Sequence, residues 1–317
     1  MDIPASLDGH PVTALATAAF YALNAVTRVT IPDSVVDIEG NPFIGCPDLT
    51  EIVVSPEHPA LQTVDGVLFS RADHRLVCYP QWIEDDTCIV PEGTEIIGDT
   101  AFYYCGYPRR IVLPKSIKAI GVEAFNWCSH LREINLPEGL ITLGEGAFRQ
   151  CLSLTRLTLP RGIVHIPDMA FWGSDVLTEL TLPADIISIG EQAFGACNGL
   201  TELTVPRSVA YIGSEAFGDQ MPLVYPDSFA WRYCRENSIH HAELTADGQV
   251  GRVWQAAQID RCDAWISLRA EPSTKAMALA QIPLGAQVLI SDADGVFLRC
   301  CYDGLEGYVL VEYIDII

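Results

Sequence analysis

One stretch of the sequence, residues 131–151, reads LREINLPEGLITLGEGAFRQC and contains the pattern that decides the fold. Ile134 and Leu136 alternate with polar neighbours, which is typical of a short strand with one buried face. Pro137 ends the strand because proline cannot donate a hydrogen bond to a sheet. Gly144 then allows a turn that a Cβ would hinder. The stretch therefore predicts a strand, a turn and a short connection, in that order.

The same pattern recurs every 23 residues. The prolines that end the strand pattern are Pro91, Pro114, Pro137, Pro160, Pro183 and Pro206. The phenylalanines expected on a single helical or 3₁₀ turn keep the same interval: Phe102, Phe125, Phe148, Phe171, Phe194 and Phe217. Phe20 and Phe43 belong to the same series. Because one unit cannot bury its apolar edge alone, the units must stack around a shared core. The repeat thus predicts a solenoid with a parallel sheet.

Four elements, Leu-x-Leu-Pro, Ile-Gly, Ala-Phe and Cys, recur in register and resemble the BspA-type leucine-rich repeats of bacterial surface proteins. The resemblance covers about residues 3–242. It implies a leucine-rich-repeat solenoid, with a parallel β-sheet and short helical or 3₁₀ turns, over residues 1–242. Glu39 and Pro167 replace the turn glycine, and Ser174 and Gln220 replace the cysteine, so we expect local irregularity at those rungs.

Two segments depart from the plain repeat. Phe43 and Phe102 lie 59 residues apart, which is one period plus an insertion of 36 residues. Two apolar runs around a polar connector predict a hairpin insertion near residues 56–90, which is a tolerated loop on the solenoid side. A capping helix is expected near 227–238, with Asp227 or Ser228 as its N-cap. Such a helix covers the core that the last rung otherwise exposes.

The 23-residue period stops after about Glu243. Short strand-like runs separated by turn residues predict a small all-β barrel over residues 243–317. Three motifs resemble bacterial SH3-like domains: residues 267–273, 283–288 and 307–314. The tryptophan often found where Val296-Phe297 stands is absent. The resemblance implies cell-wall contact with peptidoglycan as the partner, and a plain spacer is the alternative.

Charge and hydropathy exclude several classes of partner. The chain has 41 acidic and 19 basic residues, a net charge of -22, so we expect no binding to nucleic acid and none to anionic membranes. No apolar run approaches the roughly 18 residues that span a bilayer, and no membrane insertion is expected. Met1-Asp2-Ile3-Pro4 does not begin a signal peptide, so we expect the export signal to lie outside this chain.

No pattern of catalytic or metal-binding residues is found. The seven histidines are scattered, His240-His241 are expected as surface residues, and there is no nucleophile elbow or phosphate loop. We therefore expect no catalytic residue, no cofactor, no metal and no enzyme. Five of the eleven cysteines share one repeat position: Cys46, Cys105, Cys128, Cys151 and Cys197. They are expected to be buried thiols, with disulfides between rungs as the alternative.

Aromatic residues gather just after the repeat phenylalanines of three rungs: Tyr103, Tyr104, Tyr107, Trp127 and Trp172. Other rungs carry small or polar residues there, such as Gly195 and Gln150. Aromatic side chains at one edge predict an interaction surface, and packing between rungs is the alternative. The sequence thus predicts a secreted or cell-surface binding protein that engages a protein or a glycan. A structural spacer or display module without its own ligand is the second hypothesis.

Overall fold

The computed structural model describes residues 1–81, 83–259 and 265–316. The chain divides into two compact units, one formed by residues 1–201 and 213–220, the other by residues 202–212 and 221–317. The sequence predicts a boundary between residues 242 and 243. The units defined by packing differ from these limits, because the strands at 202–204, 221–224 and 241–244 and the helix at 229–236 pack with the C-terminal sheet. The repeats form a β-solenoid of about ten turns with few helices.

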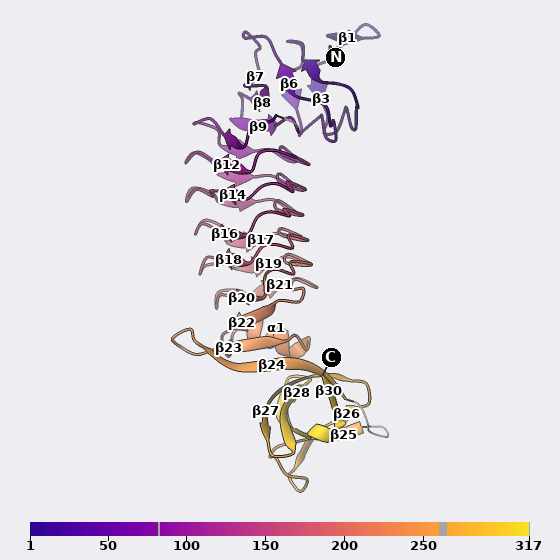
Figure 1. Cartoon of the computed structure of the whole chain (residues 1–317), viewed down its shortest axis with the longest axis vertical. Coiled ribbons are helices and arrows are strands. Elements are labelled where there is room, and N and C mark those ends of the chain that lie inside the picture. The colour runs from indigo at the N-terminus through magenta and orange to yellow at the C-terminus, as the bar shows by residue number, and fades with distance from the viewer. Residues whose placement is uncertain (82, 260–264, 317) are drawn as a thin grey trace. The chain divides into compact units, whose positions relative to one another are not determined.

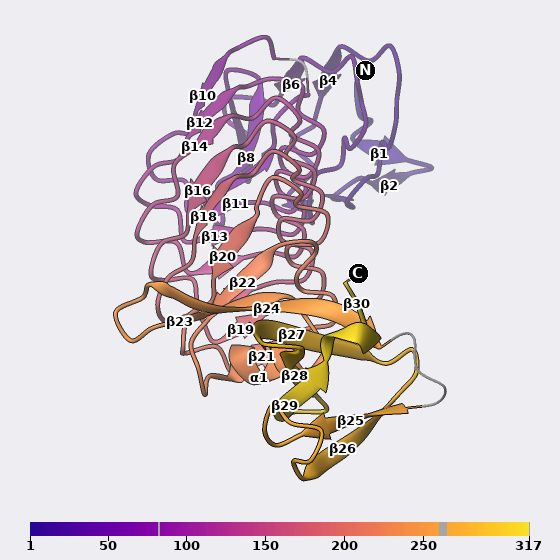
Figure 2. The ribbon, with the colours of Figure 1, turned by 60° about the horizontal axis from the view of Figure 1, so that its bottom comes forward.

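Two ladders of short parallel strands run through the first unit, where the sequence predicted one sheet (Figures 1 and 2). One ladder contains β4 (Arg28–Thr30), β6 (Glu51–Val53), β10 (Thr87–Ile89), β12 (Arg110–Val112), β14 (Glu133–Ile134), β16 (Arg156–Thr158) and β18 (Glu179–Thr181). The other contains β3 (Ala14–Leu15), β5 (Asp37–Ile38), β9 (Arg75–Cys78), β11 (Ile96–Ile97), β13 (Ala119–Ile120), β15 (Thr142–Leu143), β17 (His165–Ile166) and β19 (Ser188–Ile189). Equivalent residues pair across rungs, as Ile111 with Ile134 and Leu157 with Leu180. A short hairpin, β1 (Ser6–Leu7) with β2 (His10–Pro11), lies near the N-terminus.

The repeat phenylalanines form a continuous column of stacked rings in the core. Adjacent rings from Phe102 to Phe217 have centroids between 5.1 and 6.2 Å apart. Tyr79 extends the column, with its ring 4.9 Å from that of Phe102. These rings are almost fully buried, and burying one contributes about 1.5–3 kcal/mol. The column therefore supplies much of the stabilisation of the solenoid.

The expected helical or 3₁₀ turns of the rungs are hydrogen-bonded turns instead. Within one rung the amides of Ala147 and Arg149 donate to carbonyls three residues earlier. The intervening amides, those of Phe148 and Gln150, donate to Ala170 and Trp172 of the next rung. Because alternate amides are used between rungs, a helix cannot propagate through this segment.

The cysteine position is a column of hydrogen-bond donors. Cys128 and Cys151 donate from Sγ to the carbonyl of the phenylalanine 26 residues earlier, at 3.0 and 3.3 Å. Ser174 Oγ and Gln220 Nε2 make the same bond, at 2.8 and 3.0 Å. The two departures from cysteine thus preserve the contact and cause no irregularity there. The ten cysteines among the described residues are buried free thiols, and Cys262 lies outside those residues.

The insertion forms a rung of its own. Strands β7 (Leu61–Val64) and β8 (Val67–Ser70) make an antiparallel hairpin, and β8 pairs antiparallel with β9. Asp65 and Gly66 at the hairpin tip both have positive φ, as a tight two-residue turn requires. Strand β9 then pairs parallel with β11, which returns the chain to the regular ladder.

The second unit contains a helix and a continuous sheet (Figure 2). Its parallel part is β20 (Glu202–Thr204), β22 (Met221–Val224) and β23 (His241–Leu244), and its remaining short strand is β21 (Tyr211–Ile212). Antiparallel strands follow in the spatial order β24 (Val250–Ile259), β27 (Gln287–Asp294), β28 (Phe297–Tyr302), β29 (Leu305–Leu310), β25 (Trp265–Arg269) and β26 (Ala278–Pro283). A 3₁₀ turn (Val311–Tyr313) precedes β30 (Ile314–Ile316), which pairs with β24.

Helix α1 (Phe229–Glu236) begins at Ser228, whose side chain accepts a hydrogen bond from the Trp231 amide. His241 follows in β23 and is fully buried against Trp254, with ring centroids 6.3 Å apart. The expectation that it is a surface residue was wrong, because its strand lies inside the sheet. None of the described helices is long and apolar enough to cross a membrane.

Candidate binding surface

Three of the five predicted aromatic residues form one stacked cluster. The Tyr104 and Trp127 rings lie 5.2 Å apart at an interplanar angle of 16°, and Tyr103 packs against Tyr104 at 5.1 Å and 50°. Tyr104 is 48% exposed, whereas Tyr103 and Trp127 are half-buried. The cluster therefore leaves part of Tyr104 exposed to solvent while its rings hold one another in place.

The backbone holds this cluster in a sparsely populated conformation. Tyr104 and Trp127 have φ of 59° and 60°, and the equivalent Gln150 and Gly173 have 56° and 69°. A side chain in this left-handed region costs roughly 1–2 kcal/mol, a cost that glycine avoids. The amides of Tyr104 and Trp127 donate to Asn126 and Arg149 of the following rungs, which fixes the strained positions. Two adjacent rungs thus carry large rings where the backbone favours glycine.

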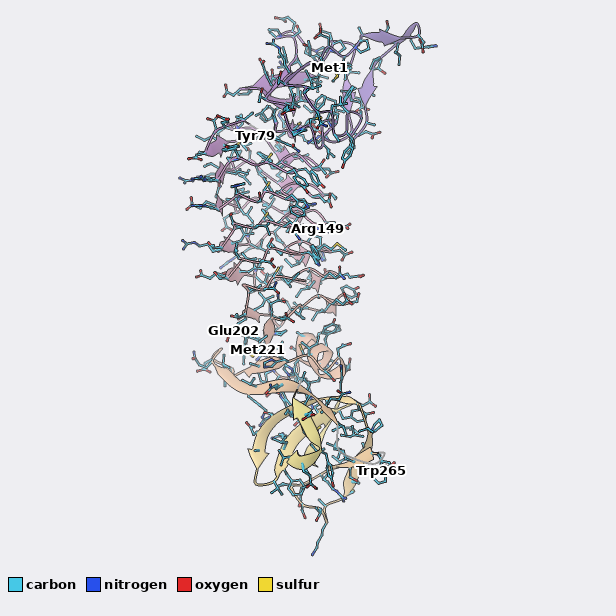
Figure 3. All side chains as sticks on the ribbon, turned by 45° about the vertical axis from the view of Figure 1, so that its right-hand side comes forward. Met1, Tyr79, Arg149, Glu202, Met221 and Trp265 are labelled. Atoms are coloured by element: carbon cyan, nitrogen blue, oxygen red, sulfur yellow. The ribbon has the colours of Figure 1, made fainter. Side chains whose placement is uncertain are left out.

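Trp172 belongs to a second group further along the same edge. It occupies the repeat position of Tyr103, and the Arg149 guanidinium lies 4.8 Å from its ring centroid. Arg149, which Figure 3 labels, also approaches Glu123 at 3.8 Å. A Cβ on Gly195 would come within 2.7 Å of Trp172 Cδ1, so the ring lies directly over that glycine. The absence of a side chain on the next rung makes room for the indole.

The structure thus brings the predicted residues together only in part. Tyr103, Tyr104 and Trp127 form the cluster, and Trp172 pairs with Arg149. Tyr107 is half-buried and precedes a cis peptide bond to Pro108. The sequence prediction missed Arg149, although its position one rung before Trp172 was the available signal. We call the set Tyr103, Tyr104, Trp127, Arg149 and Trp172 the aromatic edge.

Hydrogen-bonding groups accompany the rings. Burial raises the pKa of Tyr103, and the charge of Glu123 raises it further, so the phenol stays neutral and can donate or accept. The Arg149 and Glu123 side chains are about one third exposed. Flat rings with neutral and paired polar groups are suited to stacking on sugar rings or on aromatic side chains.

The first ladder offers a second concave surface. A hollow of about 380 Å³ lies over β14, β16 and β18, and Glu133, Arg156 and Glu179 contribute to its lining. Arg110 pairs with Glu133 at 3.3 Å, and both side chains are more than half exposed. Exposed pairs of this kind contribute about 0–1 kcal/mol. Among the described residues no group of three His, Cys, Asp or Glu side chains is placed to hold a metal.

Comparison with known proteins gives the family. Residues 7–75 and 95–223 match the sequence profile of the BspA type leucine rich repeat region, in six copies. The pneumococcal vaccine antigen PcpA is similar in structure, with a TM-score of 0.58, 24% identity, and 68% of this chain and 60% of that chain covered. A leucine rich cell surface protein from Faecalibacterium prausnitzii has a TM-score of 0.56 and 29% identity over 67% of this chain and 55% of its own.

A leucine-rich repeat protein from Eubacterium ventriosum shares the fold as well, with a TM-score of 0.56, 21% identity, and 69% and 64% of the two chains covered. The chain thus spans less than two thirds of the length of each of these three proteins. None of the curated proteins compared with it matches. Since the family profile matches more than half of its residues, the chain belongs to the BspA-type leucine-rich-repeat family.

Proposed function

We propose that this protein is a non-enzymatic, secreted or cell-surface binding protein whose aromatic edge engages a protein or a glycan. The observation that carries the proposal is the stack of the exposed Tyr104 on the half-buried Trp127 of the adjacent rung. A similar protein is described as a cell surface protein and another as a vaccine antigen, and both descriptions fit an extracellular location.

Energetic reasoning favours the aromatic edge over the hollow on the first ladder. Binding hot spots are enriched in Trp, Tyr and Arg, and the aromatic edge combines all three. Its rings are already ordered by stacking, so little side-chain entropy is lost on binding. The charged side chains over the first ladder are exposed and largely solvated. A net charge of -22 favours a neutral or basic partner over an acidic one.

In this proposal residues 243–317 form an SH3-like domain that contacts peptidoglycan. The support is the three sequence motifs together with the antiparallel pairing of β24 to β29. Because the chain is acidic, the glycan or the peptide stem is a better target than an anionic wall polymer. The competing hypothesis is a display spacer, for which the paired charges on the first ladder are the support.

The test is binding of the full chain to intact bacterial and host cells, to wall material and to a glycan array. Trp127→Ala combined with Tyr104→Ala should weaken binding by about 30-fold or more, since truncating an anchor costs about 2 kcal/mol. Tyr211→Ala, which removes an exposed tyrosine elsewhere, should bind as the parent does. If the double variant binds as tightly as the parent, the assignment of the aromatic edge as the binding surface is wrong. No binding of the parent to any of these surfaces favours the spacer.

A further inference from the structure

A pocket lies at one interruption of the first ladder, which among the described residues is also unpaired between β14 and β16. Strand β4 pairs with β6 and β10 pairs with β12, but within the described residues no pairing joins β6 to β10. Hairpin β7–β8 occupies the interval, and it leaves a cavity of about 230 Å³ beside β10. The inner lining is mostly apolar: Val67, Phe69, Leu76, Tyr79, Cys88 and Val90. All six side chains belong to buried residues.

Tyr79 gives this lining a polar atom. Only 3% of the residue is exposed, and its ring takes the place of a phenylalanine in the stacked column. Within the part of the chain that the structure describes, its hydroxyl has no hydrogen-bond partner. Burial raises the pKa of Tyr79, and the nearby Cys88, Cys105 and Asp85 raise it further, so the hydroxyl of this pocket-lining residue is neutral. A hydroxyl without a protein partner is left to solvent, and a ligand can take the place of that solvent.

The mouth of the pocket is acidic with an apolar rim. Asp65 and Asp85 line it, and both carboxylates are exposed. Among the described residues neither carboxylate forms a salt bridge. Val64 and Ile89, which also line it, are 38% and 72% exposed. This arrangement is complementary to a cation attached to an apolar body.

We infer that this pocket binds a small arylalkyl amine that carries a hydroxyl at the far end of its ring. The ring contacts Val67, Phe69 and Val90, and its hydroxyl forms a hydrogen bond with that of Tyr79. The ammonium group lies at the mouth beside Asp85 and Asp65. A volume of about 230 Å³ is below that of most drug-sized sites, which favours a single ring over a larger ligand. The inference uses no residue of the aromatic edge and is independent of the proposed partner.

The probe is tyramine, titrated into the full chain by calorimetry and followed by NMR. Two analogues each remove one feature: 2-phenylethylamine lacks the hydroxyl, and 4-ethylphenol lacks the charge. We expect each analogue to bind about tenfold more weakly than tyramine, because each loses one hydrogen-bonded or charged contact. Equal binding of all three compounds, or no binding of tyramine at millimolar concentration, overturns the inference.

Variants separate the pocket from non-specific binding. Tyr79→Phe restores the residue found in the other rungs, so it should fold and lose about tenfold in tyramine affinity while binding 2-phenylethylamine as the parent does. Asp85→Asn should weaken both amines and leave 4-ethylphenol unchanged. Glu84→Gln removes the same charge from a residue outside the lining and should bind tyramine normally. Unchanged tyramine binding by Tyr79→Phe and Asp85→Asn shows that the ligand lies elsewhere and overturns the assignment.

Discussion

At the scale of single residues, the cysteine position acts through a hydrogen bond more than through its volume. Thiol, hydroxyl and amide donors all reach the same type of carbonyl, at Cys151, Ser174 and Gln220. Burial raises the pKa of Cys151, and a neutral thiol can donate. Since the surroundings are apolar, a residue without a donor leaves that interaction unmade.

This column predicts an unusual order of stabilities. Cys151→Ser should be more stable than Cys151→Ala by about 1 kcal/mol, because the hydroxyl keeps the bond to the Phe125 carbonyl. In an apolar site without an acceptor the order is reversed. Urea unfolding of the two variants measures the difference, and an alanine variant equal to or more stable than the serine variant contradicts the interpretation.

Gly144 is required for a different reason from the one that the sequence suggested, which was the conformation of a turn. Its φ is not positive, yet a Cβ there would lie 2.3 Å from the carbonyl carbon of Gly121 in the neighbouring rung. The constraint is thus the close approach of two backbones. Gly144→Ala should destabilise the chain by about 3 kcal/mol or more, as overpacking against backbone does.

Gly93 provides the matched control for Gly144. It has a φ of +87° and open space around a built Cβ, so Gly93→Ala meets backbone strain alone. Its cost should be about 1 kcal/mol. Thermal unfolding of the two variants measures their losses of stability. A similar loss in both would contradict the interpretation that Gly144 is required by the close approach of two rungs.

At the scale of elements, one buried arginine makes several of the contacts that attach α1 to the C-terminal sheet, and Trp231 adds a hydrogen bond to Glu243 of β23. The Arg235 side chain is 5% exposed and donates from Nε and Nη2 to Cys301 Sγ at 3.2 Å. Its Nη1 donates to Glu306, and its guanidinium lies 4.3 Å from the Trp231 ring. Burial works against the Glu306 charge, but hydrogen bonds and charges from Arg299 and Arg235 outweigh it and lower the pKa of Glu306. The helix therefore belongs to the same folding unit as β28 and β29.

Replacing this arginine should uncouple the helix. Arg235→Lys cannot make three directed contacts and leaves Glu306 partly unpaired, so we expect a loss of about 3 kcal/mol. Arg232→Lys, an exposed substitution on the same helix, should change stability by less than about 0.5 kcal/mol. Denaturant unfolding followed by tryptophan fluorescence measures both, and equal effects would show that Arg235 contributes no specific contact.

The same contacts bear on how the C-terminal segment behaves alone. Residues 243–317 lack Arg235 and half of β23, the antiparallel neighbour of β24. A fragment of residues 221–317 retains both and should unfold at a higher denaturant concentration than 243–317. Equal midpoints for the two fragments would contradict this expectation.

At the scale of the whole molecule, the stability of the fold depends on pH through His241 in the second unit. Burial lowers the pKa of His241 to about 4 from 6.5, and its Nε2 has no hydrogen-bond partner. Asp315, Asp292 and Glu312 are not among the causes of this shift, whereas Glu243, Arg235 and His240 contribute smaller effects. The folded chain therefore accommodates the neutral imidazole, while the unfolded chain takes up a proton near pH 6.5.

Stability should consequently fall as the pH drops from about 6.5 towards 4. The loss from His241 is about 2 kcal/mol between pH 7.5 and pH 5. Glu306 adds to this loss of stability at pH values below the ordinary pKa of a glutamate, because the pKa of Glu306 is lowered in the folded state. Thermal unfolding across this window, with NMR titration of His241, measures the effect. His241→Asn should flatten the curve above pH 5, whereas the exposed His10→Asn should not.

Periodicity predicted the family and the residues that share a column, because each contact between rungs joins positions 23 residues apart. The interval also reaches Tyr79, which lies 23 residues before Phe102, but the prediction followed phenylalanine alone and missed that a tyrosine continues the column. Periodicity did not predict the pairing of Arg149 with Trp172, which depends on the space above Gly195. Sequence intervals give the register of a repeat, but side-chain partners depend on distances between rungs that only the structure provides.

The column of hydrogen-bond donors at the cysteine position also restricts the number of residues by which the solenoid can be lengthened or shortened, because only a complete rung keeps the bonds in register. Every donor finds its carbonyl 26 residues earlier, so a deletion that is not one complete rung separates the first donor after it from an acceptor in register. Removing residues 126–148 joins Phe125 to Arg149 and restores the order, whereas removing 126–147 does not. Such an architecture lengthens or shortens by one intact rung, about 4.8 Å at a time. The length of the solenoid is therefore set by a whole number of rungs.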